Sequence, residues 1–259
     1  MSLVNDTLVS NRESGKGSLV GYFPAGYPTL RGSVEALVAM AENGCDILEV
    51  GVPYSDPVMD GVVIQAATEE ARAAGFVLND LFEVIRQVRA RTSTPLLVMS
   101  YWNPVLRFGV ENFALEMVAA GAQGMITPDL VPDEAQQWLE VSDKHNLDRV
   151  FLVAPSSSDK RVAANSAASL GFVYSVSTMG ITGERAQVDA LARDLVDRVK
   201  SLGSTPTCVG VGISTASQVR EVNGYADGAI VGTAFVKAYQ DEGLAGLEAM
   251  TKDLARGLG

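Results

Sequence analysis

Short runs of apolar residues alternate along the chain with longer segments in which apolar residues recur at helical spacing. The short runs are continuously apolar, which is typical of parallel strands covered on both faces. Eight strands are predicted, at 18–23, 46–52, 95–100, 123–127, 149–154, 172–177, 207–212 and 227–232. Helices are predicted at 30–43, 62–74, 79–91, 109–120, 133–145, 158–170 and 186–202, from residue 214, and as a short and a C-terminal helix after the last strand.

A strand followed by a helix, repeated along the chain, predicts an α/β fold with a parallel sheet and right-handed crossovers. Eight such units in about 250 residues fit a closed (β/α)8 TIM barrel. The alternative is an open, doubly wound sheet, which usually has a glycine-rich turn after its first strand. Here PAGYPT (24–29) follows the first strand without the G-x-G-x-x-G spacing, so the barrel is favoured. No linker or charge block divides the chain, and residues 1–259 are predicted to form a single TIM-barrel domain.

Composition limits the possible functions. The 259 residues are 47% hydrophobic, enough for a sizeable core, and carry a formal net charge of -11 at pH 7. That balance argues against binding nucleic acid or anionic membranes through a general electrostatic field. No segment approaches the ~20 apolar residues of a membrane span, and the N-terminus has no apolar signal-peptide core. We therefore expect a cytoplasmic protein whose two cysteines, Cys45 and Cys208, are reduced and buried.

A carboxylate lies inside the second predicted strand. TIM barrels have their active sites at the C-terminal ends of the strands. Glu49 lies near the C-terminal end of this strand, in the run LEVGVP. Glu49 shares one face of the strand with Ile47, whereas Leu48 and Val50 share the other. A carboxylate packed under helices without a partner would be costly, so Glu49 is predicted to point into the barrel interior, or lumen. Desolvation there would raise its pKa and suit it to general acid–base catalysis; a Glu paired with Arg or Lys, or at a hydrated strand end, is the alternative.

Two aspartates follow in the loop after this strand. Asp60 lies just before the helix that is predicted to begin near Val62, so it is either a helix cap or a second catalytic carboxylate. Asp56, in a Ser-Asp-Pro sequence, is most simply a turn former. Position alone does not separate these roles.

The ends of the last two strands share a second pattern. Gly212 precedes Ile213-Ser214, and Gly232 precedes Thr233. At both junctions a glycine ends the strand, and a residue with a hydroxyl group follows it where the next helix begins. Glycines let a backbone approach closely, and helix N-termini direct N–H groups at anions. Plain turn chemistry is the alternative, but the repeated pattern favours a phosphate site at these two junctions. Gly183, after the sixth strand, is predicted to close over the same spot.

The sequence lacks the residues that several other kinds of catalysis require. The single histidine, His145, falls late in a predicted outer helix, where a surface position is expected. One histidine and two cysteines do not supply a catalytic zinc site, and no metal is predicted. The lysines all fall outside the predicted strand ends, which argues against a Schiff base. The remaining possibility is acid–base catalysis by carboxylates, acting on a phosphorylated small molecule and requiring no cofactor.

The sequence also resembles a known family over nearly its whole length. LEVGVPYSDPVMDGVVIQ is closely similar to the signature of tryptophan synthase alpha subunits, a long and specific motif. The resemblance extends to YFPAGYP in the first strand and its loop, PDLVPDE after the fourth strand, ITG after the sixth and VGTAFVK after the eighth.

The resemblance implies an activity and roles for individual residues. The family cleaves indole-3-glycerol phosphate to indole and glyceraldehyde 3-phosphate, a retro-aldol reaction in tryptophan biosynthesis. Glu49 corresponds to the family's acid–base residue, and Asp60 to the carboxylate that stabilises positive charge at the indole nitrogen. The expected substrate-binding residues are Tyr22, Tyr174, Thr182, Gly183, Gly212, Gly232 and Thr233, where the family often has Ser at the last position.

The resemblance further implies a partner. Pro53 and Asp56 fall in the loop that contacts the beta subunit of an alpha-beta-beta-alpha heterotetramer, and pyridoxal phosphate is expected in that subunit. The chain departs from common family residues at Tyr27, Val62, Thr178 and Met179, which affects partner activation more than the chemistry. Two alternatives stay open: a stand-alone lyase that releases free indole, and a non-catalytic regulator of the beta chain.

Overall fold

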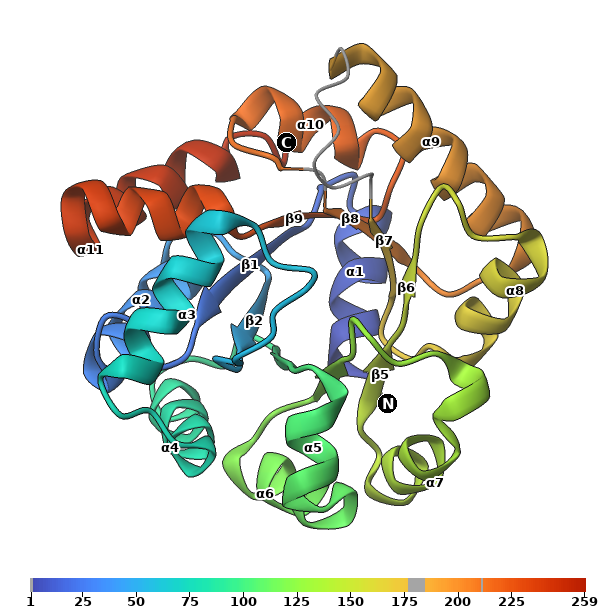
Figure 1. The fold of residues 1–259 in the computed structure, drawn as a ribbon. Coiled ribbons are helices and arrows are strands. Elements are labelled where there is room, and N and C mark those ends of the chain that lie inside the picture. The colour runs from blue at the N-terminus through green and yellow to red at the C-terminus, as the bar shows by residue number, and fades with distance from the viewer. Residues whose placement is uncertain (1, 177–184, 211) are drawn as a thin grey trace.

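Parallel strands form one sheet that is wound into a ring (Figure 1). The computed structural model describes residues 2–176, 185–210 and 212–259. The strands are β1 (Leu19–Pro24), β2 (Ile47–Gly51), β3 (Leu96–Met99), β4 (Gly124–Ile126), β5 (Asp148–Val150), β6 (Leu152–Val153), β7 (Val173–Val176), β8 (Thr207–Gly210) and β9 (Gly228–Val231). Their order is β5-β4-β3-β2-β1-β9-β8-β7-β6, and every pair is parallel.

The ring closes through the chain itself. β5 and β6 lie at opposite ends of the strand order but are separated in sequence only by Phe151. The fifth predicted strand, 149–154, is therefore divided in two, because the N–H of Phe151 donates to the hydroxyl of Ser169 at 3.2 Å instead of to a strand. Counted as one, the divided strand gives the eight-stranded barrel that the sequence predicts, and the open-sheet alternative is wrong.

Helices surround the ring (Figure 1). They are α2 (Leu30–Glu42), α3 (Val62–Ala73), α4 (Leu78–Arg89), α5 (Trp102–Phe108), α6 (Val110–Ala120), α7 (Gln136–His145), α8 (Asp159–Ala168), α9 (Arg185–Leu202), α10 (Ala216–Asn223) and α11 (Thr233–Ala255). The helix predicted at 133–145 begins with a separate 3₁₀ turn, η1 (Pro132–Glu134), and α11 is kinked at Gly243, so the two predicted C-terminal helices are confirmed as its halves. Among the described residues, none of these helices is long and apolar enough to cross a membrane.

An additional helix, α1 (Leu3–Glu13), closes the N-terminal end of the barrel and was not predicted. Its Val4 and Leu8 pack into the lumen cluster of Val20, Ile47, Leu97, Ile126, Val150, Phe172, Cys208 and Ile230. Figure 1 shows α1 in the middle of the ring of strands. Both cysteines are reduced and buried, as predicted, and Cys208 belongs to this cluster.

Hydrogen bonds and an ion pair fix α1 at its two ends. Ser2 caps the helix by accepting from the N–H of Asn5 at 2.9 Å, and its hydroxyl donates to Asp148 Oδ2 at 2.7 Å. At the other end, Arg12 pairs with the buried carboxylate of Asp227 at 3.0 Å. Burial raises the pKa of Asp148 to about 6, and the bond from Ser2 opposes that shift.

The raised pKa makes Asp148 a source of pH-dependent stability. A folded-state pKa above the unfolded value means that the stabilisation is complete below about pH 4 and is lost as the pH rises through about 6. We expect Asp148→Asn to remove this dependence and to raise the free energy of unfolding near pH 7.5 by up to about 3 kcal/mol, the equivalent of roughly two pKa units. Urea unfolding at pH 4 and pH 7.5 measures it. The same pH dependence in wild type and variant would contradict the assignment to Asp148.

Candidate active site

Glu49 points into the lumen, as the alternation of side chains along β2 predicts. Ile47, two residues earlier, lies in the lumen cluster, whereas Leu48 and Val50 lie in the cluster between sheet and helices. Glu49 is fully buried, and neither of its carboxyl oxygens has a hydrogen-bond partner among the described residues. Burial raises the pKa of Glu49 to about 8, so the group is mainly protonated at neutral pH. Among the described residues, no Arg or Lys pairs with Glu49, and its complete burial excludes a hydrated strand end.

Asp60 does not cap the following helix. The N-cap of α3 is Gly61, and no side chain bonds there. Instead, the hydroxyl of Tyr101 donates to Asp60 Oδ1 at 3.2 Å and accepts from the N–H of Met59 at 2.9 Å. Burial raises the pKa of Asp60 to about 6, while the bond from Tyr101 lowers it. Asp60 is thus mainly ionised at neutral pH, the opposite of Glu49.

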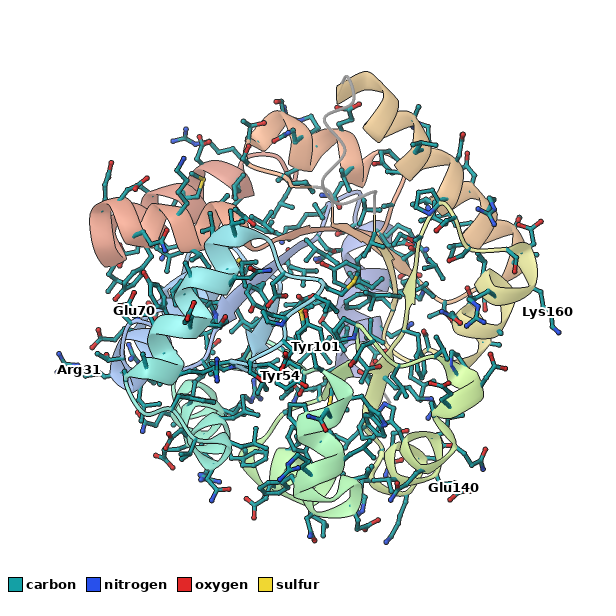
Figure 2. All side chains as sticks on the ribbon, viewed as in Figure 1. Arg31, Tyr54, Glu70, Tyr101, Glu140 and Lys160 are labelled. Atoms are coloured by element: carbon teal, nitrogen blue, oxygen red, sulfur yellow. The ribbon has the colours of Figure 1, made fainter. Side chains whose placement is uncertain are left out.

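Tyr101 is a site residue that the sequence analysis did not select. It stacks on Tyr54, with ring centroids 5.2 Å apart, and the hydroxyl of Tyr54 accepts from Asn103 Nδ2 at 3.0 Å. Figure 2 shows Tyr54 and Tyr101 close together near the middle of the barrel. The pair connects the loop after β2 to the loop after β3. Its position directly after the third predicted strand, where a TIM barrel has its active site, was the feature of the sequence that could have identified it.

Tyr22 and Tyr174 lie in the lumen beside the two carboxylates. Tyr22, on β1, is opposite Glu49 in the strand register, and Tyr174 is on β7. Burial raises the pKa of both hydroxyls well above the usual value, and the charges of Glu49 and Asp60 raise both further. The structure therefore brings four predicted site residues together at one end of the lumen.

The proposed phosphate site lies at the ends of β8 and β9, which are neighbours in the sheet. Gly212 has a φ of 71°, which favours glycine, and among the described residues no atom beyond its chain neighbours lies within 4 Å of where its Cβ would be. Gly232 is the N-cap of α11, and Thr233 is its first residue, so the helix directs unpaired backbone N–H groups at this junction. The predicted residues Thr182 and Gly183, and the departures Thr178 and Met179, lie outside the described residues.

The loop predicted to contact a partner has an exposed side. Asp56 is exposed, whereas Pro53 is buried. The loop and the start of α3 also expose two apolar side chains, Val58 at 77% and Val62 at 80%.

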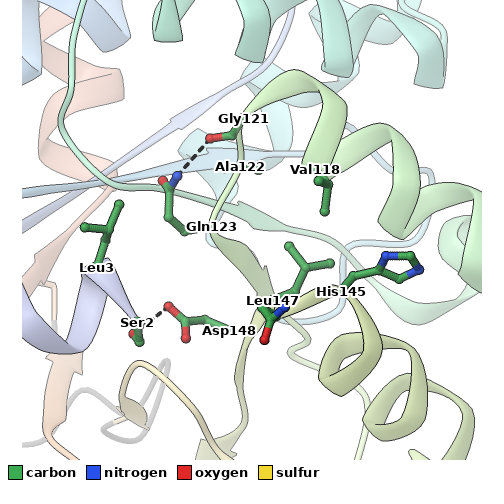
Figure 3. A pocket seen from close by; sticks show the side chains of 10 residues that line it. Ser2, Leu3, Val118, Gly121, Ala122, Gln123, His145, Leu147 and Asp148 are labelled. Carbon is green, nitrogen blue, oxygen red and sulfur yellow. Dashed lines mark hydrogen bonds between the residues drawn. The ribbon is translucent and has the colours of Figure 1, made fainter.

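A separate pocket of about 290 Å³ lies away from the two carboxylates, beside the start of α1 (Figure 3). Ser2, Gln123, His145 and Asp148 are among its lining residues, and the figure shows the Ser2–Asp148 hydrogen bond at its edge. His145 Nε2 lies 2.7 Å from Glu111 Oε1, in a hydrogen-bond contact between the outer helices α6 and α7. His145 is the last residue of the outer helix α7, as predicted, but its side chain is only 15% exposed and not fully at the surface.

Comparisons with known proteins agree on one family. The family model described as "Tryptophan synthase alpha chain" matches residues 8–256. A protein of that name from Leifsonia xyli is 55% identical, over 99% of this chain and 98% of its own, and one from Mycobacterium intracellulare is 51% identical, over 95% and 91%. Among solved structures, tryptophan synthase from M. tuberculosis in an aminoacrylate-bound form matches with a TM-score of 0.93 and 46% identity over 100% of both chains. A tryptophan synthase complex from Pyrococcus furiosus matches with a TM-score of 0.84 and 33% identity, over 93% of this chain and 97% of that one.

The bond between Tyr101 and Asp60 yields a prediction. A hydrogen bond to an ionised carboxylate lowers its pKa, so we expect Tyr101→Phe to raise the pKa of Asp60 above its value of about 6. A titration followed by carbon-13 NMR of the aspartate carboxyls measures the change. Tyr54→Phe is the matched control, because it keeps the Tyr101 hydroxyl. An unchanged or lower pKa in Tyr101→Phe would contradict the role of this bond.

Proposed function

The chain belongs to the tryptophan synthase alpha chain family, and from that premise we propose that Glu49 and Asp60 together cleave indole-3-glycerol phosphate to indole and glyceraldehyde 3-phosphate. The enzyme is a carbon–carbon lyase that serves tryptophan biosynthesis as the alpha subunit. One observation carries the assignment of roles: two carboxyls at one end of the lumen have pKa values of about 8 and about 6. At neutral pH one is therefore an acid and the other an anion.

The two protonation states fit the two requirements of the reaction. Protonated Glu49 donates its proton to indole C3, and the ring nitrogen becomes positively charged. Ionised Asp60 stabilises that charge. The Glu49 carboxylate then takes the proton of the glycerol hydroxyl on the carbon attached to C3. As the carbon–carbon bond breaks, its electron pair returns to the ring, the nitrogen becomes neutral, the hydroxyl oxygen becomes the aldehyde oxygen, and Glu49 is protonated again.

Substrate binding is assigned to the residues around the two carboxyls. Tyr22 and Tyr174 bury the indole ring, because aromatic walls in a dry lumen favour a flat apolar group. Gly212, Gly232 and Thr233 hold the phosphate at the ends of β8 and β9, and helix α11 contributes the backbone donors. Thr182 and Gly183 are assigned to the same phosphate site on the resemblance alone.

The partner is proposed to be a tryptophan synthase beta subunit in an alpha-beta-beta-alpha heterotetramer. The exposed side of the loop after β2, with Asp56 and Val58, is the proposed contact surface; Pro53, which the resemblance also assigns to the contact, is buried in this chain. Pyridoxal phosphate is assigned to the beta subunit, since the two carboxyls of this chain supply the acid, the base and the charge stabilisation for the cleavage. The reaction is placed in the cytoplasm, because a phosphorylated substrate does not cross membranes freely.

Replacing the acid–base group tests the function directly. We expect Glu49→Gln to lower kcat for indole release by at least about 10³-fold, because the amide neither donates nor accepts the required protons. Binding of glyceraldehyde 3-phosphate should persist, as measured by calorimetry, since the phosphate site is untouched. Each variant is assayed with and without purified beta chain: high wild-type activity alone would support a stand-alone lyase. Turnover retained in Glu49→Gln would contradict the role of Glu49.

The two pKa values also predict a bell-shaped pH profile. Below about pH 6, Asp60 becomes protonated and loses the charge that stabilises the indole nitrogen. Above about pH 8, Glu49 ionises and has no proton for C3. We therefore expect kcat/KM to be highest near pH 7 and to fall on both sides. A rate that keeps rising above pH 8 would mean that Glu49 acts first as a base and would overturn the proposed order of steps.

A further inference from the structure

The ring of Tyr22 is held between two glycines. β1 lies between β2 and β9 in the sheet, and each neighbour ends in a glycine, Gly51 in β2 and Gly232 just after β9. A Cβ on Gly51 would overlap the Tyr22 hydroxyl, and a Cβ on Gly232 would lie 3.2 Å from Tyr22 Cδ1. The ring therefore leans over the end of β2, and its hydroxyl lies against Gly51.

This position puts the hydroxyl next to the acid–base residue. Gly51 is the next position after Glu49 on the same face of β2, and Tyr22 is the register partner of Glu49. Beyond Gly51, the chain continues into the loop that carries Asp60. The hydroxyl of Tyr22 thus lies on the path from Glu49 to Asp60, where the substrate must bind.

The hydroxyl and the Glu49 carboxyl both lack protein partners. Tyr22 is only 6% exposed, and no hydrogen bond to its hydroxyl is found among the described residues. Neither oxygen of Glu49 has one either. A buried carboxyl without a partner is rare and costly, so Glu49 indicates a site that a ligand completes, and the Tyr22 hydroxyl lies on the same face of the sheet with no described hydrogen-bond partner of its own.

Tyr174 provides an internal comparison. Its ring leans in the same manner over Gly210 of β8, where a Cβ would lie 2.6 Å from the Tyr174 hydroxyl. Its register partner, however, is Cys208 and not an acid. Tyr22 is therefore the tyrosine whose register partner is the proton-transfer residue, although the charges of Glu49 and Asp60 act on both hydroxyls.

We propose that the Tyr22 hydroxyl is a third catalytic group, which donates a hydrogen bond to the glycerol hydroxyl oxygen that becomes the aldehyde oxygen. This inference rests on the proposed function. As Glu49 removes the proton from that oxygen, negative charge builds on it before the carbon–carbon bond has fully broken. A donor fixed in a dry lumen stabilises that charge without reorganising. Tyr22 keeps its own proton throughout, and the raised pKa of its hydroxyl is consistent with a donor that does not ionise.

The test removes the hydroxyl and keeps the ring. We expect Tyr22→Phe to lower kcat for indole-3-glycerol phosphate cleavage by about 10- to 100-fold, with little change in KM, because the bond strengthens as charge develops. Tyr27→Phe is the matched control: Tyr27 is equally buried, but it packs with Phe23 and Tyr239 in the outer core, and its loss should leave kcat unchanged. Circular dichroism and thermal unfolding verify that both variants are folded.

A substrate analogue separates a catalytic from a packing role. In this analogue, hydrogen replaces the hydroxyl on the carbon attached to indole. Wild type and Tyr22→Phe should bind it with equal affinity, because the proposed acceptor is missing. Full kcat in Tyr22→Phe, or weaker binding of the analogue by that variant, would overturn the inference while the wild-type cleavage still supported the proposed function. A wild-type protein that does not cleave indole-3-glycerol phosphate would reject both.

Discussion

The burial of the Glu49 carboxyl without a partner is the constraint on which the rest of the site depends. Desolvation makes its ionised form expensive, so the folded protein keeps it protonated until the pH reaches about 8. The folded-state pKa is raised above the unfolded value of 4.5, so Glu49 destabilises the fold progressively as the pH rises from about 4.5, and its full cost is reached above about pH 8. The unfavourable ionised form occurs in the proposed cycle only after Glu49 has donated its proton, when a positive charge has formed on the substrate. The same desolvation that shifts the pKa therefore makes the carboxylate a strong base at the step that needs one.

A barrel can hold such a group because its lumen is filled in layers. The lower layer is apolar and is closed from below by Val4 and Leu8 of α1, which excludes water from that end. The upper layer holds Glu49 and the tyrosines, and Gly51, Gly210 and Gly232 leave space for the aromatic rings. Because side chains alternate strictly along each strand, a residue assigned to the upper layer has little freedom to point elsewhere. The position of Glu49 is therefore fixed by backbone geometry, not by hydrogen bonds.

That geometry also decides what the sequence could predict. The strands follow from continuously apolar runs, and the direction of Glu49 follows from the alternation of side chains along its strand; a single sequence displays both. Helix α1 was missed because it is mostly polar and buries only two side chains, and α5 was missed because Pro104 lies in its first turn. The division of β5 from β6 depends on the contact of Phe151 with Ser169, eighteen residues away in the chain. The bond between Asp60 and Tyr101 spans 41 residues, and no local pattern separates that role from a helix cap.

Glu49 and Asp60 differ in how firmly the structure holds them, so they differ in how strongly the binding of a partner would affect them. Glu49 is on a strand paired on both sides, with β1 and β3 as neighbours. Asp60 is on a loop, and its carboxylate is positioned by the hydroxyl of Tyr101, which also accepts from the N–H of Met59. The exposed side chains of Asp56 and Val58 belong to the same loop, within four residues of Asp60. A protein that binds this surface would contact the loop that carries Asp60, whereas β2 is held by strand pairing on both sides. Partner binding would therefore change how the charge at the indole nitrogen is stabilised, while the proton transfers by Glu49 remain a fixed property of the barrel.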